Sequence, residues 1–353
     1  MKTGASKRKK GFLVLTLTVT MILLIFQAAI PFWGAAKDEY YTVSYEAEYT
    51  KARYLAQSGL EMALKLLKSI PTNILYDYGI MSGYPIGPIP LIGEAAFTFQ
   101  IEEAGGKINL NYLVNSFDDS ANSKILGALN GLSEKLNIPP DKWEAVIDWI
   151  DENNDKSPGG YEKDDYLMMQ PARRIKNGKM HSIDELLLIS GFDQRIIYED
   201  LRTEQEKEFY SDSFFTEEEK EAVTDEDYKL INNITVDMPV NPSLSGGWSK
   251  INVNSAPYHV LLSLSSYMTS DAAKEIIMKR NEKRFKNINE LSALPSLKIN
   301  TSGALTLFHE IKDLLTTKDI LYKIVVKASL ESQVAQVVGY YDPQAKKLST
   351  YFE

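Results

Sequence analysis

A run of apolar residues near the N-terminus constrains this chain more than any other feature. The 25 residues from Phe12 to Ala36 carry no formal charge. As a helix that rises about 1.5 Å per residue, the run would span roughly 38 Å, which is enough to cross a lipid bilayer. Five basic residues and no acidic residue precede it within the first eleven positions. Because basic flanks stay in the cytoplasm, the sequence predicts one transmembrane helix at 12–36, with the remaining chain on the far side.

Composition limits what the remaining chain can do. The whole chain has 353 residues and a net charge of −9, so the residues after the first eleven together carry −14. Such an acidic body would repel a phosphate backbone, which disfavours nucleic acid as a partner. The chain contains no cysteine, and this excludes thiolate metal sites, cysteine nucleophiles and disulfides.

Catalytic motifs are also missing from the sequence. It has no Gly-x-Ser-x-Gly elbow, no phosphate-binding loop and no His-Glu-x-x-His motif. His181, His259 and His309 are far apart in the sequence, and we expect each to be a helix-cap or surface residue. We therefore expect a protein that is not an enzyme.

The junction between the basic segment and the apolar run is distinctive. Gly11 separates the two, and Phe12 opens the apolar run. This junction resembles the class III signal of type IV pilins and type II secretion pseudopilins. The resemblance implies that a leader, 1–11, is removed after Gly11 by prepilin peptidase and that Phe12 is then methylated. A secretory signal peptide and a plain signal anchor remain as alternatives from the residues alone.

The fifth position after that junction narrows the resemblance. Most such subunits have glutamate there, whereas this chain has Thr16. In the family, that glutamate pairs with the free amine of the subunit ahead, so a subunit with nothing ahead does not need it. The chain is therefore similar to the general secretion pathway protein K family of minor pseudopilins.

This resemblance implies a role and a set of partners. The role is capping the tip of the type II secretion pseudopilus during export of folded proteins across the outer membrane. The implied partners are minor pseudopilins I and J, the major pseudopilin, prepilin peptidase and the inner membrane. The implied placement is a single pass through the inner membrane, with a cytoplasmic N-terminus and a periplasmic body. A minor pilin of a type IV pilus is the nearest alternative.

Helical periodicity continues beyond the membrane run. Seven small or apolar residues follow one helix face up to Pro71, which should end the helix. They are Ala52, Leu55, Ala56, Gly59, Leu60, Ala63 and Leu67. We expect one long helix whose second half packs on a globular head. By the resemblance, minor pseudopilins I and J would bury this stripe in a shared bundle.

The body contains an internal repeat. Lys107–Asn111 returns as Lys250–Asn254, and Ser182–Leu186 returns as Asn287–Leu291. The offset falls from 143 to 105 residues, so the first copy is 38 residues longer. Ser182 and Asn287 each begin a capping box and should start a helix. The pattern predicts two helical copies, 107–191 and 250–300, joined by an acidic linker.

Much of the extra length lies in an acidic segment of the first copy. Asp151, Asn153 and Asp155 have the 1, 3, 5 spacing of a calcium loop, and Glu162 falls at the twelfth position. Lys156 occupies the sixth position, where an EF-hand requires glycine, so an EF-hand is disfavoured. A solvated acidic loop is the alternative from composition alone.

The resemblance to the protein K family implies that this acidic segment binds calcium. Asp-Trp-Ile-Asp at 148–151, a Gly-Gly loop and Ser-Ile-Asp-Glu-Leu at 182–186 resemble the signature of that family, which holds calcium in its helical domain. The resemblance implies one or two Ca²⁺ ions, and Asp148 is either an extra ligand or a helix-surface charge. The ligands that it implies are Asp151, Asn153, Asp155, Glu162 and Asp165.

Strand patterns flank the helical region. Residues 96–102 and segments within 321–352 alternate in the manner of strands, and they should form a small antiparallel sheet. The predicted fold is α+β, a pilin-like long helix on this sheet with a large inserted all-α domain of two helix-hairpin-helix-like repeats. The predicted parts are leader 1–11, membrane helix 12–36, helix and first strands 37–106, inserted domain 107–315 and last strands 316–353.

The second repeat also resembles helix-hairpin-helix modules that bind DNA. Such modules approach phosphates through a glycine-bearing hairpin, whereas Ser265–Ser270 contains no glycine. A membrane-anchored DNA-uptake protein is therefore the second alternative, and it is disfavoured.

Overall fold

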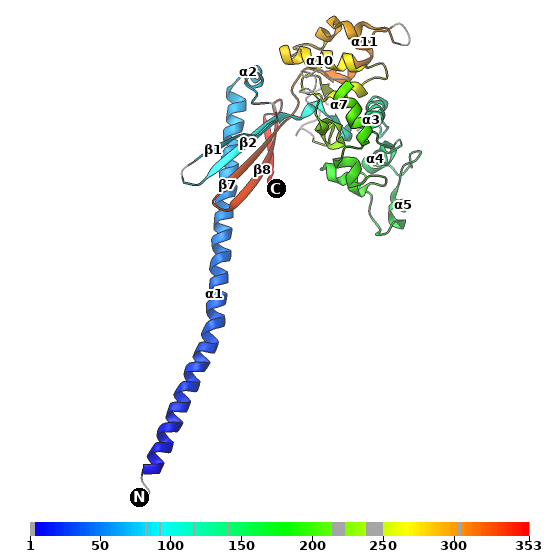
Figure 1. Ribbon diagram of the computed structural model, residues 1–353. Coiled ribbons are helices and arrows are strands. Elements are labelled where there is room, and N and C mark those ends of the chain that lie inside the picture. The colour runs from blue at the N-terminus through cyan, green and yellow to red at the C-terminus, as the bar shows by residue number, and fades with distance from the viewer. Residues whose placement is uncertain are drawn as a thin grey trace.

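The computed structural model describes residues 4–81, 83–91, 93–115, 117–139, 141–213, 223–237, 250–301 and 305–352. One long helix extends away from the rest of the molecule, a sheet packs against its upper part, and a group of short helices lies beside the sheet (Figure 1). The N-terminus lies at the free end of the long helix. Most of the mass therefore gathers at the opposite end of that helix.

The long helix, α1 (Gly4–Ser69), has 66 residues and contains both the apolar run and the apolar stripe. Among the described residues, α1 is the one helix that is long and apolar enough to cross a membrane, and none of its most apolar window is buried. It ends before Pro71, which lacks the N–H that a continuing helix needs. Pro71 precedes the short helix α2 (Thr72–Asp77).

The sheet has five antiparallel strands in the order β1-β2-β7-β8-β9. β2 pairs with β7 from Ala96 opposite Ser329 to Glu103 opposite Tyr322. This pairing joins a strand from before the inserted region to one from after it. The strands are β1 (Ile86–Pro90), β2 (Ala96–Glu103), β7 (Tyr322–Leu330), β8 (Gln333–Asp342) and β9 (Lys347–Phe352).

Small residues let α1 pack tightly on this sheet. Ala52 and Ala56 are fully buried against it, in one apolar core with strand residues such as Val326. A Cβ atom added at Gly59 would lie 2.8 Å from Cγ1 of Val326 and 3.0 Å from the ring of Phe97. The close approach of helix and sheet therefore depends on glycine at this position.

This packing corrects one expectation about the stripe. Six of its seven residues are buried under the chain's own sheet and Leu55 is half-buried, so partner helices cannot cover the stripe in this fold. The prediction that the stripe packs on the head agrees with the structure. The surface of α1 that remains open to a partner is formed by other residues, and Tyr54 and Met62 are exposed there.

The two copies of the repeat make equivalent hydrogen bonds. The side chain of Asn111 accepts from the N–H of Met180 at 2.7 Å and donates to the Met180 carbonyl at 2.9 Å. Asn254 makes the same pair of bonds to Phe285, at 2.9 Å each. Met180 and Phe285, the residues that these asparagines bind, each lie two positions before a capping box. The second asparagine of each repeated motif therefore helps to fix where the capping box begins.

Each copy also forms a short parallel pair of strands. β3 (Ile108–Asn109) pairs with β4 (Ile234–Thr235), and β5 (Ile251–Asn252) pairs with β6 (Leu315–Thr316). The predicted capping boxes at Ser182 and Asn287 are both present, but they start 3-10 helices rather than α-helices.

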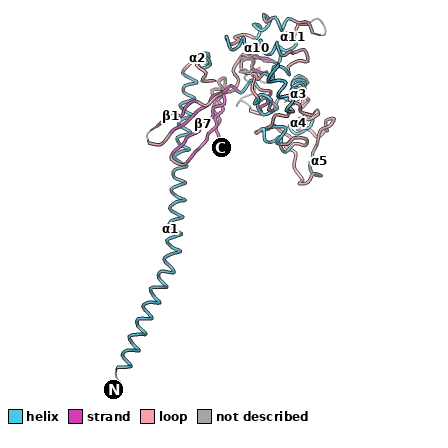
Figure 2. The backbone as a smooth tube through the Cα atoms, in the orientation of Figure 1, coloured by secondary structure: helices cyan, strands magenta, loops and turns pink. Residues whose placement is uncertain are grey.

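Short helices linked by long loops make up the inserted region (Figure 2). The first helices of the two copies cross closely, because a Cβ at Gly131 would lie 2.8 Å from the Ser263 carbonyl oxygen. The α-helices are α3 (Ser123–Lys135), α4 (Trp143–Ile150), α5 (Lys163–Met168), α6 (Gln194–Tyr198), α7 (Glu204–Ser213), α9 (Tyr258–Ser263), α10 (Ser270–Glu282) and α11 (Leu307–Ile311). The 3-10 helices are η1 (Ala104–Gly106), η2 (Leu110–Tyr112), η3 (Ile183–Leu188), η4 (Asp225–Tyr228), η5 (Leu230–Asn232), η7 (Ile288–Ala293), η8 (Pro295–Lys298) and η9 (Lys312–Leu314).

A buried carboxylate joins the sheet to the inserted region. Glu103, at the end of β2, accepts hydrogen bonds from the N–H groups of Gly105, Ile320 and Leu321 and from the hydroxyl of Ser255. Its side chain therefore connects both ends of the insertion to the second copy. Burial, with the charge of Asp319 adding to it, raises the pKa of Glu103 to about 7.

One strand and one histidine add detail to the predictions or correct them. β1, which lies within the predicted range of first strands, carries two prolines in Ile-Gly-Pro-Ile-Pro and forms at the edge of the sheet, where proline is tolerated. His259 is buried rather than at a cap or the surface, and its ring lies 4.2 Å from that of Tyr228 and 5.0 Å from that of Tyr258. Burial lowers the pKa of His259 to about 4.

Candidate metal centre

Three carboxylates meet below the surface of the first copy. Asp148, Asp151 and Glu162 are all buried, and one oxygen from each lies within 4.8 Å of the others. Two oxygens bound to one Ca²⁺ ion at 2.3–2.6 Å lie at most about 5 Å apart. The spacing of the group therefore suits a single hard cation.

Two helix ends place these side chains. Asp148 lies in the last turn of α4 and Asp151 is its C-cap, so their i, i+3 spacing puts both on one face. Glu162 is the N-cap of α5, and the carboxylate of Asp165 accepts from the Glu162 N–H at 3.0 Å. The two ring systems of Trp149 and Tyr166, 5.4 Å apart, bring α4 and α5 together.

The buried oxygens of this group lack donors. Within the described structure, Oδ1 of Asp151 and both carboxylate oxygens of Glu162 have no hydrogen-bond partner. Asp148 differs, because the Ser157 N–H donates to its two oxygens at 3.1 and 3.3 Å. An unpartnered buried carboxylate oxygen costs several kcal/mol, and a cation would remove that cost.

Burial and the crowding of like charges raise two pKa values in this group. Burial first, and then the charges of Asp119, Asp148 and Glu162, raise the pKa of Asp151 to about 7. Burial and the charge of Asp148 also raise the pKa of Glu162. Each of these carboxyls is therefore easier to protonate than normal unless a cation neutralises the group.

A glycine pair lets the loop close over Asp148. A Cβ at Gly160 would lie 2.0 Å from Oδ2 of Asp148, a distance at which no side chain fits. Gly159 has φ +88°, a left-handed conformation that favours glycine. The Gly-Gly sequence in the insertion therefore has a structural reason beside the carboxylate group.

The structure brings together only part of the predicted ligand set. Asp151 and Glu162 converge with Asp148, which sequence reasoning had left as either a ligand or a surface charge. Asp155 is exposed, and its N–H donates to Oδ1 of Asn153 at 2.6 Å. The bond from the Glu162 N–H, and then the Lys156 ammonium 3.0 Å away, lower the pKa of Asp165.

Two neighbours of the group behave differently from the prediction. Asn153 donates from Nδ2 to Oδ2 of Asp151 at 3.0 Å and to Oδ2 of Asp119 at 3.1 Å. Asp119, more than thirty positions earlier in the chain, was not predicted to be near the site at all. No local sequence signal could have found it, because its approach depends on the fold of a separate loop.

The predicted processing residues lie on the exposed part of α1. Gly11 and Phe12 fall within the helix, and Phe12 is 72 % exposed. The hydroxyl of Thr16 donates to the carbonyl of Phe12 at 2.8 Å, one turn back along the helix. Thr16 is therefore satisfied within its own helix and needs no charged partner.

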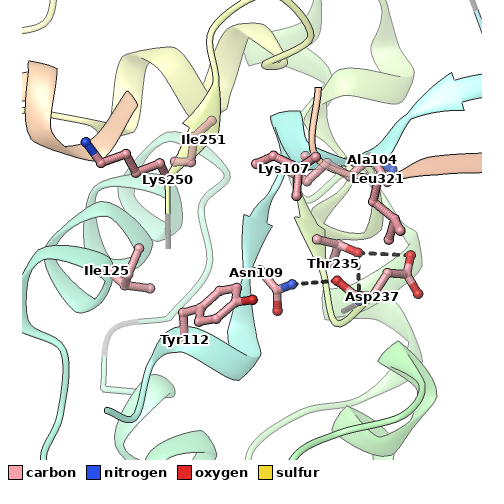
Figure 3. Close-up of a pocket in the computed structure, with 12 residues that line it drawn as sticks. Ala104, Lys107, Asn109, Tyr112, Ile125, Thr235, Asp237, Lys250, Ile251 and Leu321 are labelled. Carbon is pink, nitrogen blue, oxygen red and sulfur yellow. Dashed lines mark hydrogen bonds between the residues drawn. The ribbon is translucent and has the colours of Figure 1, made fainter. Parts of the chain in front are cut away.

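A small cavity lies where the starting strands of the two copies meet the sheet (Figure 3). Asn109 donates to the carbonyl of Asp237 at 2.7 Å, and the hydroxyl of Thr235 donates to the Asp237 carboxylate at 3.1 Å. Burial raises the pKa of Asp237, and the charges of Lys323 and Lys107 oppose that shift. The hydrogen bonds drawn there join Asn109, Thr235 and Asp237 and so connect the first copy of the repeat to the strand pair beside it.

Comparisons with known proteins agree with this architecture. Family models described as type II secretion system (T2SS), protein K, match residues 106–202 and 251–307. No curated protein matches the chain. A chain in the crystal structure of the GspK-GspI-GspJ complex from the type 2 secretion system of enterotoxigenic Escherichia coli has the same fold. The TM-score is 0.58 at 14% identity, over 87% of this chain and 97% of that chain.

The two family matches fall on the two copies of the repeat, and the structural likeness extends over the helix and sheet that carry them. Both copies of the inserted helical region therefore match the type II secretion system protein K family.

Proposed function

We propose that this protein is a minor pseudopilin that caps the tip of the type II secretion pseudopilus and so takes part in export of folded proteins across the outer membrane. The observation that carries the proposal is the distribution of mass. The sheet and both helical copies gather at the end of α1 away from the N-terminus (Figure 1). In a filament whose core is a bundle of such helices, this bulk would occupy the space of a following subunit.

Thr16 supports the same position in the filament. Its hydroxyl bonds within its own helix, so the chain carries no carboxylate there that would need the amine of a subunit ahead. A buried carboxylate without a partner is costly in an apolar bundle. A terminal subunit avoids that cost by having threonine.

The N-terminal segment is proposed to follow the pseudopilin route. Prepilin peptidase removes residues 1–11, Phe12 is methylated, and the helix anchors the protein in the inner membrane with its body in the periplasm. Mass spectrometry of the protein purified from membranes should find a mature N-terminus at methylated Phe12. A mature chain that begins elsewhere would refute this route.

The proposed partners are minor pseudopilins I and J, with the major pseudopilin below them. The solved neighbour is itself part of a GspK-GspI-GspJ complex. The stripe on α1 is occupied by the sheet, so the partners are expected on the open side of α1, where Tyr54 and Met62 are exposed. Co-expression with the I and J proteins of the same system should give a complex that Tyr54→Asp weakens and that Gln194→Asp, an exposed control in α6 of the inserted region, leaves intact.

Calcium is the proposed cation of the carboxylate group. Asp148, Asp151 and Glu162 supply hard oxygen ligands, and Ca²⁺ takes six to eight oxygens, the rest from backbone carbonyls or water. In this role calcium would hold the end of α4 to the start of α5. Bound calcium stabilises the fold, and no reaction step is assigned to it.

Isothermal titration of the full chain in detergent tests this assignment. The wild type should bind Ca²⁺, whereas Asp151→Asn and Glu162→Gln should each weaken binding at least tenfold. Asp164→Asn is the control, because Asp164 is exposed and two positions from Glu162. Binding that all three variants retain would refute the site.

The DNA-uptake alternative finds no support in the hairpin of the second copy. The hydroxyl of Ser265 donates to the carboxylate of Glu310 at 2.7 Å. A negative charge therefore lies against the turn that would have to approach a phosphate group.

The alternative of a type IV pilus minor pilin differs only in which filament the subunit joins.

A further inference from the structure

We propose that Asp119 is a positioning residue for the metal loop, so that cation binding is coupled to the order of the separate loop that carries it. This inference rests on the proposed calcium site and assigns to it a second segment of the chain, 113–122. Asp119 acts by holding the backbone of the loop, and it does not bind the cation.

Four hydrogen bonds attach Asp119 to the start of the metal loop. Its Oδ2 accepts from the N–H groups of Glu152 and Asn153, each at 3.0 Å, and from Nδ2 of Asn153 at 3.1 Å. Its Oδ1 accepts from the Glu152 N–H at 3.2 Å. These donors follow Asp151 directly, so the carboxylate of Asp119 fixes the direction in which the chain leaves α4.

The side chain of Asn153 links Asp119 to the carboxylate group. Nδ2 of Asn153 donates to Asp119 and also to Oδ2 of Asp151. This second bond leaves Oδ1 of Asp151 without a protein donor. Asp119 therefore orients the unpartnered oxygen of Asp151 through Asn153 and does not contact the cation.

The bond count argues against Asp119 as a ligand. Asp119 is not one of the three residues whose oxygens converge, and its Oδ2 already accepts from three N–H groups while its Oδ1 accepts from one. Carboxylates that orient ligands from outside the coordination shell commonly change metal affinity by about 10–100-fold.

The second copy of the repeat supplies an internal comparison. α3 begins twelve positions after Asn111, whereas α9 begins only four positions after the equivalent Asn254. The first copy thus has a second insertion besides the acidic one, and Asp119 lies in it. The described part of the second copy has neither insertion and no such carboxylate group. The two additions contact each other and occur together in the first copy.

Local hydrogen bonds close the described part of the Asp119 loop. Asn115 donates to the Ser120 carbonyl at 2.8 Å and accepts from the Asp119 N–H at 3.0 Å, and Ser120 bonds to the side chains of Asn115 and Asp118. Asp119 has φ +57°, a left-handed conformation that is uncommon for a residue other than glycine. The four bonds to Glu152 and Asn153 attach this closed loop to the metal loop.

Terbium and calcium binding to the full chain in detergent test the proposal. Calorimetry gives Ca²⁺ affinity, and Tb³⁺ luminescence, sensitised by the nearby Trp149, gives the number of bound waters from lifetimes in H₂O and D₂O. Asp119→Ala should weaken Ca²⁺ binding about 10–100-fold with an unchanged water count. Asp119→Asn should restore part of the affinity, because its amide oxygen still accepts. Asp118→Asn, an exposed charge in the same loop, is the control.

Hydrogen exchange provides the second measurement. In the wild type, Ca²⁺ should slow amide exchange in 113–121 as well as in 151–162, and Asp119→Ala should abolish the slowing in 113–121. Unchanged Ca²⁺ affinity in Asp119→Ala would overturn the proposal, and an extra terbium-bound water would show that Asp119 is a ligand instead. If Asp151→Asn and Glu162→Gln also bind normally, the calcium site itself fails, and the proposal with it.

Discussion

Asp151 and Glu162 hold three of their four carboxylate oxygens in buried positions without a hydrogen-bond donor. Such an arrangement destabilises a protein unless something neutralises it, since desolvation and like-charge repulsion act in the same direction. The raised pKa values of both residues have that cause. At the scale of single residues, the site is therefore a source of strain that a cation converts into a source of stability.

Glu162→Gln should reverse its effect on stability with calcium. Without the ion, the substitution removes a repelling buried charge and should stabilise the chain by about 1–3 kcal/mol. With saturating Ca²⁺, it removes a ligand and should destabilise by a similar amount. Thermal unfolding in EDTA and in Ca²⁺ measures both effects, with Asp164→Asn as the control. Destabilisation of equal size in both buffers would show a purely structural role for Glu162.

Glu103 should make the stability of the calcium-saturated protein depend on pH. Its pKa is about 7 in the folded chain, above its ordinary value of 4.5, so the folded state binds the proton more tightly than the unfolded state. The contribution of Glu103 to stability is therefore largest below about pH 4.5 and is lost as the pH rises through 7, a loss of about 3 kcal/mol. Glu103→Gln should flatten that part of the profile of unfolding temperature against pH. A variant with the same slope as the wild type would assign the dependence to other groups.

At the scale of elements, the contact between α1 and the sheet sets the geometry of the head. The helix lies close because the residues that face the strands include alanine and glycine. Gly59 leaves the least room, with Val326 and Phe97 both within 3.0 Å of where its Cβ would be. Overpacking at such a contact forces side chains or backbone to move.

Gly59→Val should therefore lower the free energy of unfolding by about 1–3 kcal/mol. Gly34→Ala is the matched control in the same helix, because a Cβ there would have no heavy atom within 4 Å. Chemical denaturation of the two variants in detergent compares them. An unfolding midpoint for Gly59→Val equal to that of the wild type would contradict the tight packing of α1.

Sequence patterns predicted elements well where the signal was local. The apolar run, the stop at Pro71 and the capping boxes depend on residues within a few positions, and the structure contains all three. Elements set by distant contacts were predicted only in outline or misassigned. β1 forms although its prolines disfavour a strand, because β2 provides the edge on which it pairs. The stripe of α1 fits a partner helix or a sheet equally well in sequence, and only the fold shows which one covers it.

The residues of the candidate site likewise fall into those that local spacing predicts and those that depend on distant contacts. Asp151 and Glu162 were predicted from loop spacing, and Asp148 follows from helical spacing once α4 is known to end at Asp151. Asp155 has the correct spacing, but it is exposed and is not one of the carboxylates whose oxygens converge. Asp119 depends on the contact between two insertions, which no spacing rule describes.

At the scale of the whole molecule, the chain is a long apolar helix with a large head at one end (Figure 1). Two repeated helical copies supply most of that head, and they are inserted between strands that pair with each other in one sheet. The N-terminal half of the helix is exposed along its apolar length, which suits a membrane first and a bundle of helices later.

Immunogold electron microscopy of assembled pseudopili tests the central claim most directly. Antibodies against the inserted helical region should label one end of each pseudopilus, while antibodies against the major pseudopilin label its whole length. This result follows if the head blocks addition of a further subunit. Gold particles from the helical-region antibody distributed along the filament would contradict the account, because subunits would then follow this protein in the bundle.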